Sequence, residues 1–331
     1  MNVQTMGEPS APEAVAFRLD GRGGATETEP GDRDGAAPGG FFWLQLPVGA
    51  PETPDRLRAA GLDEYAVEAL TAEETRPRCT VHEDGVVLIL RGVNLHPDSE
   101  PEDMISVRLW VTGDRVIGAT RRPLYAIGDL VAACRRGQAP HSPGDFVAKL
   151  ALRLADRAEP AVADLNDIMD DIEEAAMDPD AEIPRAPLSS ARRSSILLRR
   201  HLVPQRDALS TLEIEDLPWL ADRDRSRLRE AADRVTRLGE ELDALRDRAQ
   251  LLHDQVMDQR AERLNQRMLL LSVVASIFLP LSLLTGLLGI NVGGIPGAGR
   301  PWAFWVVAGS IVVIGLALWW WFSRMGLLKR R

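Results

Sequence analysis

Two long uncharged segments near the end of the chain stand out from its pattern of polar and apolar residues. Residues 268–290 form a run of 23 residues without a charged side chain, and residues 302–322 form a second run of 21. At about 1.5 Å of rise per residue, a helix of either length can cross the hydrocarbon core of a bilayer. The pattern predicts two transmembrane helices, joined by a short outer loop at 291–301 and preceded by a large polar region.

The polar region is expected to begin with a disordered tail and to continue into an α/β domain. Residues 1–40 contain 12 Gly or Pro and seven acidic residues, too little apolar surface to offset the entropy of ordering. Five short apolar segments then indicate strands, with turn sequences between two pairs of them that are typical of hairpins. The predicted strands are 41–46, 79–81, 86–91, 105–111 and 115–120. With short helices interspersed, residues 41–150 are expected to contain a small, largely antiparallel sheet.

Residues 151–267 have the pattern of helices, ending in a long stalk helix that begins near Asp222. Along the stalk, apolar residues recur at alternating spacings of three and four. They are Leu228, Ala231, Val235, Leu238, Leu242, Leu245, Ala249, Leu252 and Val256. This seam fits an ordinary dimeric coiled coil. However, no Gly or Pro lies between Gly239 and the first apolar run, so the same helix is expected to continue into the membrane. An ordinary coiled coil does not explain this continuation.

The face of the stalk opposite the seam forms a stripe that continues into the first apolar run. Outside that run the stripe is mostly acidic, and inside it is polar or small at most positions. Its members are Glu230, Asp233, Arg237, Glu240, Ala244, Asp247, Leu251, Asp254, Asp258, Ala261, Asn265, Met268, Ser272, Ala275, Leu279, Ser282, Gly286 and Gly289. A solvated helix surface is also polar, but the part within the membrane is more specific. The stripe is a candidate pore lining.

Basic residues predict the orientation of the two spans. Arginines are frequent just before the first span and in the basic end at 323–331, whereas the connecting loop holds only Arg300. The excess of positive charge places both termini in the cytoplasm. Five of the eight tryptophans lie at the ends of the second span, where aromatic residues meet the membrane interface. The net charge of −10 argues against a nucleic-acid partner.

One further segment is rich in acids. Residues 164–178 contain seven acidic residues and no basic one. Apolar residues occupy the other face of the same predicted helix, so a solvated amphipathic surface is the simpler interpretation. A surface that attracts or senses cations is the alternative.

The sequence at the outer end of the first span is the most specific motif in the chain. Residues 286–297 read GLLGINVGGIPG, and their glycines permit close helix approach and a sharp turn. Asn291 lies where the span leaves the membrane. A ring of such carboxamides, one from each subunit, offers oxygen atoms to a hydrated cation. A helix end closed by Asn and Gly explains the same residues and is compatible with that ring.

These features resemble the CorA family of divalent-cation transporters. The tripeptide Gly289-Ile290-Asn291 is similar to the Gly-Met-Asn of magnesium-transporting members, and the continuation 292–297 before a Trp-rich span resembles the zinc-transporter (ZntB-type) branch. Segments 75–79, 91–94 and 101–104 resemble that branch too. The resemblance covers residues 41–331 and implies a homopentameric funnel in a bacterial inner membrane, with Zn²⁺ as a principal cargo.

The resemblance also implies roles for individual residues. Gly289, Ile290 and Asn291 correspond to the outer selectivity motif, and Asp254 and Asp258 to the neck of the funnel. The pore-facing positions that it implies are Asn265, Met268, Leu279 and Ser282, and the stripe adds Ser272 as a candidate pore-lining residue. One departure is that the outer loop has no acidic residue and carries Arg300, so attraction of cations from outside is not explained.

The types of residue in the spans limit the ways in which zinc could be bound during transport. Residues 268–322 contain no Cys, His, Asp or Glu, the residues that bind bare zinc, so the ion is expected to cross wholly or partly hydrated. For the same reason, any proton coupling would use water or groups outside the spans. In the polar region, His253 with its neighbour Asp254 is a candidate metal site, and the pair Cys79 and His82 is a weaker one.

The leading hypothesis is therefore zinc transport through a homopentameric pore, with no resident cofactor. A channel for Mg²⁺, Co²⁺ or Ni²⁺ is the alternative within the same class. A membrane-anchored coiled-coil scaffold or sensor is the alternative from another class, but it needs neither the polar stripe nor the Gly-x-Asn motif. An enzyme is not expected, because the sequence offers no nucleophile with a base and no phosphate-binding loop.

Overall fold

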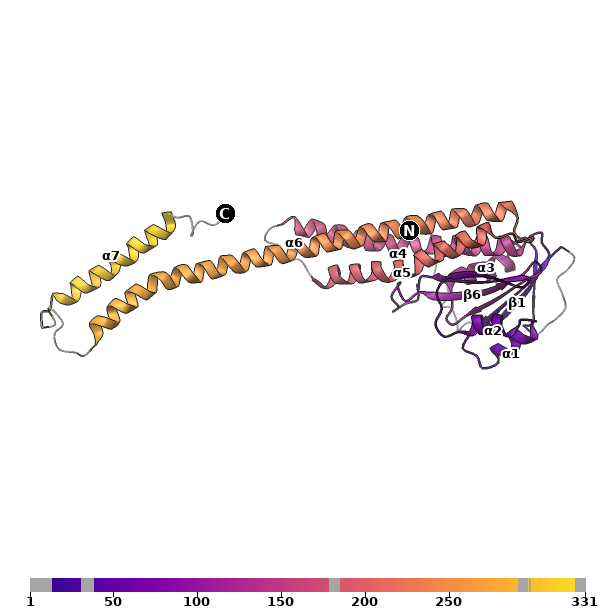
Figure 1. The fold of residues 1–331 in the computed structure, drawn as a ribbon, viewed down its shortest axis with the longest axis horizontal. Helices are drawn as coiled ribbons and strands as arrows, with labels where there is room; N and C mark the ends of the chain where they lie inside the picture. Colours follow the sequence, from indigo (N-terminus) through magenta and orange to yellow (C-terminus); the bar gives the residue numbers. More distant parts are fainter. Residues whose placement is uncertain (1–13, 31–38, 179–184, 291–296, 298, 325–331) are drawn as a thin grey trace. The chain divides into compact units, whose positions relative to one another are not determined.

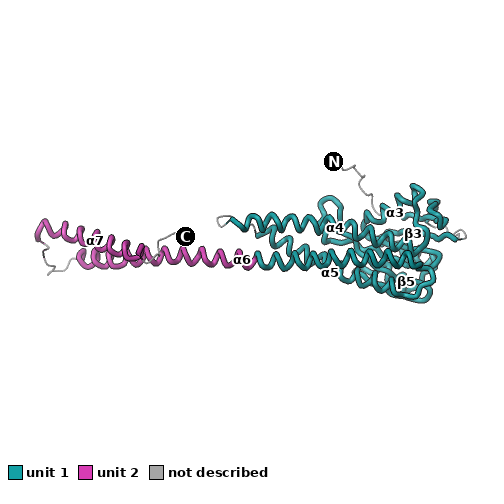
Figure 2. Tube along the Cα trace, turned by 90° about the horizontal axis from the view of Figure 1, so that it is seen from above, with its two compact units in different colours: residues 1–252 teal, residues 253–331 magenta. Residues whose placement is uncertain are grey.

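The computed structural model describes residues 14–30, 39–178, 185–290, 297 and 299–324 (Figure 1). The chain divides into two compact units, Met1–Leu252 and His253–Arg331 (Figure 2). One helix, α6 (Asp222–Gly289), contributes to both units. No helix end and no glycine interrupts the passage from the predicted stalk to the predicted first span.

The first unit contains a seven-stranded sheet in the order β2-β1-β3-β7-β6-β5-β4. Only β3 and β7 are parallel, and every other neighbouring pair is antiparallel. The strands are β1 (Val15–Leu19), β2 (Ala25–Thr28), β3 (Phe41–Pro47), β4 (Arg78–His82), β5 (Gly85–Gly92), β6 (Ile105–Val111) and β7 (Arg115–Thr120). The five strands expected from the sequence are all present, and β6 and β7 have the predicted bounds.

The expectation of a disordered tail over residues 1–40 is wrong for residues 15–28. These residues form β1 and β2, and β1 pairs with β2 on one side and β3 on the other. Phe17 shows why the segment folds: its ring stacks on Trp43 at 5.5 Å, so the strand buries apolar surface against a distant part of the chain. Residues 1–13 and 31–38 lie outside the described residues.

Helices cover both faces of the sheet. On one face, α1 (Thr53–Ala59) and α2 (Glu64–Thr71) bury Leu57, Val67 and Leu70 against strand residues. On the other face lie α3 (Tyr125–Arg135), α4 (Pro143–Ala176) and α5 (Arg185–Ile214), and Phe146 of α4 meets the Trp43 ring at 4.8 Å. Because α4 runs through residue 150, the expected boundary between an α/β domain and a helical region is not a structural boundary.

The seam of α6 is buried within a single chain. Each of its members up to Val256 is less than 9% exposed, and Leu242 is completely buried. Figure 2 shows α4 and α5 running beside the part of α6 that belongs to the first unit. Ion pairs join the helices at both ends of the bundle, with Arg227 bound to Asp145 and Arg248 bound to Asp170 and Glu173. A three-helix bundle, not a dimeric coiled coil, therefore explains the heptad pattern.

Several basic side chains lie close to Arg108 of β6 and to His201 of α5. Arg108 of β6 is 1% exposed, and only its Nη2 has a partner among the described residues, donating to the carbonyl of Ala72 at 2.9 Å. Burial and the neighbouring arginines lower the pKa of Arg108 to about 10. The same two causes, with burial the larger, lower the pKa of His201 on α5 to about 4.

The second unit consists of the rest of α6 and α7 (Ala303–Arg324). Both helices are long and apolar enough to cross a membrane. They pack against each other, because a Cβ built on Gly315 would lie 3.7 Å from Cδ1 of Leu281. The end of α6 lies one residue before the predicted end of the first span, and α7 lies within two residues of the predicted bounds of the second. The loop expected at 291–301 lies mostly outside the described residues.

Candidate functional site

In the first unit, the stripe of α6 is the face that internal packing leaves uncovered. All seven of its members there are exposed, while every seam residue on the opposite face is buried. Leu251 makes the contrast clearest, since it is 70% exposed although the adjacent Leu252 is buried. The helix thus has one side committed to α4 and α5 and one acidic side available to solvent or to another subunit.

In the second unit, the stripe lies on the side of α6 away from α7. The residues of α6 that are least exposed here recur at helical spacing and face α7: Val273, Ile277, Leu281 and Leu284. At about 100° per residue, the direction midway among these residues lies nearly opposite the direction of Ser272, Leu279 and Ser282. The candidate pore-lining side chains are therefore not the ones that bind the second span.

The individual positions predicted for the ion path are all exposed in the single chain, where the structure describes them. They are Asp254, Asp258, Asn265, Met268, Ser272, Leu279, Ser282, Gly289 and Ile290. Gly289 is the last residue of α6, and Ile290 follows it. Asn291 lies outside the described residues, so its role in the outer motif stays a prediction.

Aromatic and basic side chains mark the two ends of α7. Trp302 lies under Arg300, with the guanidinium carbon 6.0 Å from the ring centre, and Trp320 lies under Arg324 at 5.2 Å. Such cation–π pairs combine an apolar ring with a charge that prefers water. Both pairs fit the aromatic belts expected at the membrane interfaces.

Hydroxyl groups within the spans differ in how they are used. Thr285 donates to the carbonyls of Leu281 and Ser282 on its own helix, and Ser310 donates to Val306 of α7. These bonds satisfy the hydroxyl donors locally, which is how such residues are accommodated in an apolar environment. Thr285 and Ser310 thus have structural explanations that do not require an ion.

The weaker metal-binding pair in the polar region is not brought together. Cys79 and His82 are three residues apart in β4, so their side chains project from opposite faces of the sheet. Burial and the nearby Glu215 raise the pKa of the Cys79 thiol to about 12, which keeps it protonated and a poor metal ligand. His82 instead contacts Asp63, a residue 19 positions earlier that was not predicted as a ligand.

His253 is exposed on α6, and the adjacent Asp254 is exposed too. Within the described residues, one group of three metal-ligating side chains occurs, and it does not include His253. A metal site at His253 therefore remains a prediction.

The acidic helix segment is partly committed to internal ion pairs. Asp170 and Glu173 bind Arg248 at 2.5 Å and 2.8 Å, and this contact lowers the pKa of the Glu173 carboxyl. Leu165, Met169 and Ile172 on the opposite side are buried against the bundle. The remaining acids face solvent, as an amphipathic surface requires.

Comparison with known proteins places these features in context. The family model described as "CorA-like Mg2+ transporter protein" matches residues 38–329. The chain is 40% identical over 287 residues to the divalent cation transporter CmaX of Pseudomonas aeruginosa, covering 86% of each chain. It is 34% identical over 310 residues to the zinc transport protein ZntB of Pectobacterium carotovorum, covering 93% of this chain and 94% of the other. The solved structure of full-length CmaX matches with a TM-score of 0.81 at 37% identity, over 97% of this chain and 99% of that one.

Proposed function

Because the chain belongs to the CorA-like Mg2+ transporter family and is a divalent-cation transporter of that type, we propose that its cargo is Zn²⁺. Zinc crosses through an axial pore formed by several copies of α6, and a homopentamer is the assembly. The protein resides in the bacterial inner membrane with both termini in the cytoplasm. Members of this family are transporters, and the chain is not an enzyme.

The observation that carries the pore is the uncovered stripe of α6. Polar and small side chains in a span are tolerated where they face protein or a water-filled cavity, not lipid. Neither α7 in the second unit nor α4 and α5 in the first cover this face. Symmetric assembly of the chain around the stripe encloses it and gives Ser272 and Ser282 a wet environment.

Zinc as the cargo is supported by the relatives named zinc transport protein ZntB. The spans hold no Cys, His or carboxylate, so the ion passes with its water shell, and Asn291 with nearby carbonyls recognises that shell. A divalent ion entering the cell gains about 4.6 kcal/mol per 100 mV of membrane potential, at about 2.3 for each charge. The membrane potential is therefore sufficient to drive uptake. A proton gradient, coupled through water molecules, adds to this driving force.

Mg²⁺, Co²⁺ or Ni²⁺ is the alternative cargo. The family description names Mg²⁺, and CmaX is named only as a divalent-cation transporter. Parallel measurement of these ions under one protocol separates the two hypotheses.

The test is metal flux into liposomes containing the full-length protein and a Zn²⁺-sensitive dye. We expect Asn291→Ala to reduce zinc flux or selectivity, and Ser282→Leu to block flux by placing a large apolar side chain in the pore. Ser310→Leu is the matched control, because Ser310 lies on α7, is exposed and already bonds its own helix. Equal flux in the Ser282→Leu and Ser310→Leu proteins contradicts the pore assignment. Absence of flux for any divalent ion favours a scaffold.

A further inference from the structure

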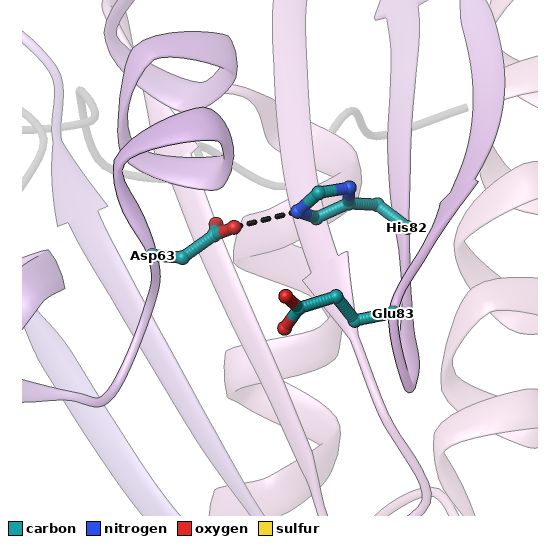
Figure 3. Close-up of side chains that lie close together, drawn as sticks. All are labelled: Asp63, His82 and Glu83. Carbon is teal, nitrogen blue, oxygen red and sulfur yellow. Dashed lines mark hydrogen bonds and ion pairs between the residues drawn. The ribbon is translucent and has the colours of Figure 1, made fainter.

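Three potential metal ligands meet on the first unit, away from the stripe of α6. Asp63 precedes α2, His82 ends β4, and Glu83 is the first residue of the turn into β5 (Figure 3). One ligand atom from each lies within 4.8 Å of the other two. Nε2 of His82 is 2.5 Å from Oδ2 of Asp63. In Figure 3 the three side chains point into the same space.

The surrounding structure holds two of the ligands in place. Oδ1 of Asp63 accepts the backbone N–H of Ala66 at 2.9 Å, which caps α2 and leaves Oδ2 directed at His82. The His82 ring lies 4.3 Å from the Tyr65 ring and 6.1 Å from the Trp110 ring. Gly85 makes room for that tryptophan, since a Cβ there would lie 2.4 Å from its ring. The imidazole is thus positioned by packing before any ion arrives.

Glu83 is held by the turn. Its φ of 51° lies in the left-handed region, which is uncommon for a residue with a side chain. Glycine would adopt this conformation more readily. The carboxylate of Glu83 lies beside His82 (Figure 3), at a backbone position that would favour glycine.

The charges also favour a cation. Two carboxylates lie beside one imidazole, so two like charges are close together and a bound cation would offset their repulsion. The hydrogen bond between Asp63 and His82 ties α2 to the β4–β5 hairpin, which is a structural explanation for these two residues. It does not explain why Glu83 lies beside them.

We propose that Asp63, His82 and Glu83 bind one Zn²⁺ ion per chain, with water completing the coordination. One imidazole nitrogen and two carboxylate oxygens form a ligand set that zinc uses in proteins. Mg²⁺ prefers oxygen ligands alone and retains several waters, so the nitrogen selects for zinc. Two ligands about 2.0–2.1 Å from a tetrahedral zinc are roughly 3.3 Å apart, so the His82–Asp63 contact opens by less than about 1 Å.

The half-exposed position makes this an exchangeable site. The side chains of His82 and Asp63 are 29% and 38% exposed, so an ion enters and leaves without unfolding. Occupancy joins the start of α2 to the β4–β5 hairpin. Zinc binding at this site does not depend on which ion the protein transports. A role for the site in sensing the transported ion would rest on the proposed function.

The test is zinc titration of the full-length, metal-free protein in detergent against a chromophoric competitor. Glu83→Gln removes an exposed carboxylate, His82→Phe keeps the ring packing, and Asp63→Asn keeps a helix cap. Asp84→Asn is the matched control, since Asp84 is an exposed acid in the same turn but outside the cluster. Circular dichroism verifies that each variant is folded.

We expect the wild type and Asp84→Asn to bind one more Zn²⁺ per chain than the three cluster variants. If a variant still binds zinc at this site, its affinity should be lower by at least about 10–100-fold. That is the loss caused by removing a residue that only hydrogen-bonds to a metal ligand. Millimolar Mg²⁺ should not displace the ion. Unchanged zinc stoichiometry and affinity in both Glu83→Gln and His82→Phe overturn the proposal. Liposome flux distinguishes failure of this zinc site from failure of the proposed transport function. Asn291→Ala should alter flux and leave zinc binding at Asp63, His82 and Glu83 intact.

Discussion

Replacing Leu242 by alanine should loosen the bundle of α4, α5 and α6 without affecting the stripe. Leu242 is completely buried on the seam, so the change removes packed apolar volume from the interior of one chain. Comparable substitutions in other proteins cost about 3 kcal/mol or more. Leu251, about two and a half helical turns further along on the stripe, is 70% exposed. By its smaller buried area, Leu251→Ala should cost less than about 1 kcal/mol.

Hydrogen exchange of the intact protein in detergent measures these costs locally. At about 1.4 kcal/mol per factor of ten, Leu242→Ala should accelerate exchange of the bundle amides by about 100-fold. Leu251→Ala should accelerate it by less than about tenfold. Similar acceleration in the two variants contradicts the burial argument. An effect of Leu242→Ala that weakens with rising protein concentration contradicts the assignment of the seam to one chain.

Three further predictions concern the titratable groups of the first unit. Arg108→Met should leave thermal stability unchanged or raise it, because the buried guanidinium is only partly hydrogen-bonded; a scanning melt in detergent, in which a large decrease would contradict this, is the measurement. Since the pKa of folded His201 is about 4, below the unfolded value of about 6.5, the unfolded chain binds more protons between these values, and stability should fall as the pH falls from 6.5 to 4. His201→Gln should flatten that part of the melting-temperature profile, and an unaltered slope would refute the assignment. Burial raises the pKa of Cys79 to about 12 and of Cys134 to about 11, so iodoacetamide at neutral pH should modify both only after denaturation, as mass spectrometry can follow.

Elements with strong local patterns were predictable from the sequence. The strands β6 and β7 are apolar runs on either side of a short polar turn, and both have the predicted bounds. The strand β1 was not predicted, because its neighbours are rich in Gly and acidic residues. What stabilises β1 is pairing with β3 and the stacking of Phe17 on Trp43, and composition within residues 1–40 carries no information about either.

Side-chain spacing had similar limits at the candidate sites. The heptad pattern correctly identified the buried face of α6, but a periodic seam is the same whether its partner is another chain or α4 and α5. The spacing of Cys79 and His82 suggested a pair that the alternation of a strand separates. Asp63 and Glu83 are 20 residues apart, and only the packing of α2 beside the hairpin brings them together. An Asp before a predicted helix and a Glu in a predicted turn were the available signals.

The single-chain bundle has a consequence for the order of events during synthesis. All of α4 and α5 precedes α6 in the chain, and so does every strand of the sheet. The first unit ends at Leu252, and the ribosome synthesises this residue before the first apolar run at 268–290. Domains generally fold as units, N-terminal parts first. A folded first unit is therefore expected to be present before the hydrophobic helices emerge from the ribosome, so membrane insertion follows the folding of the first unit.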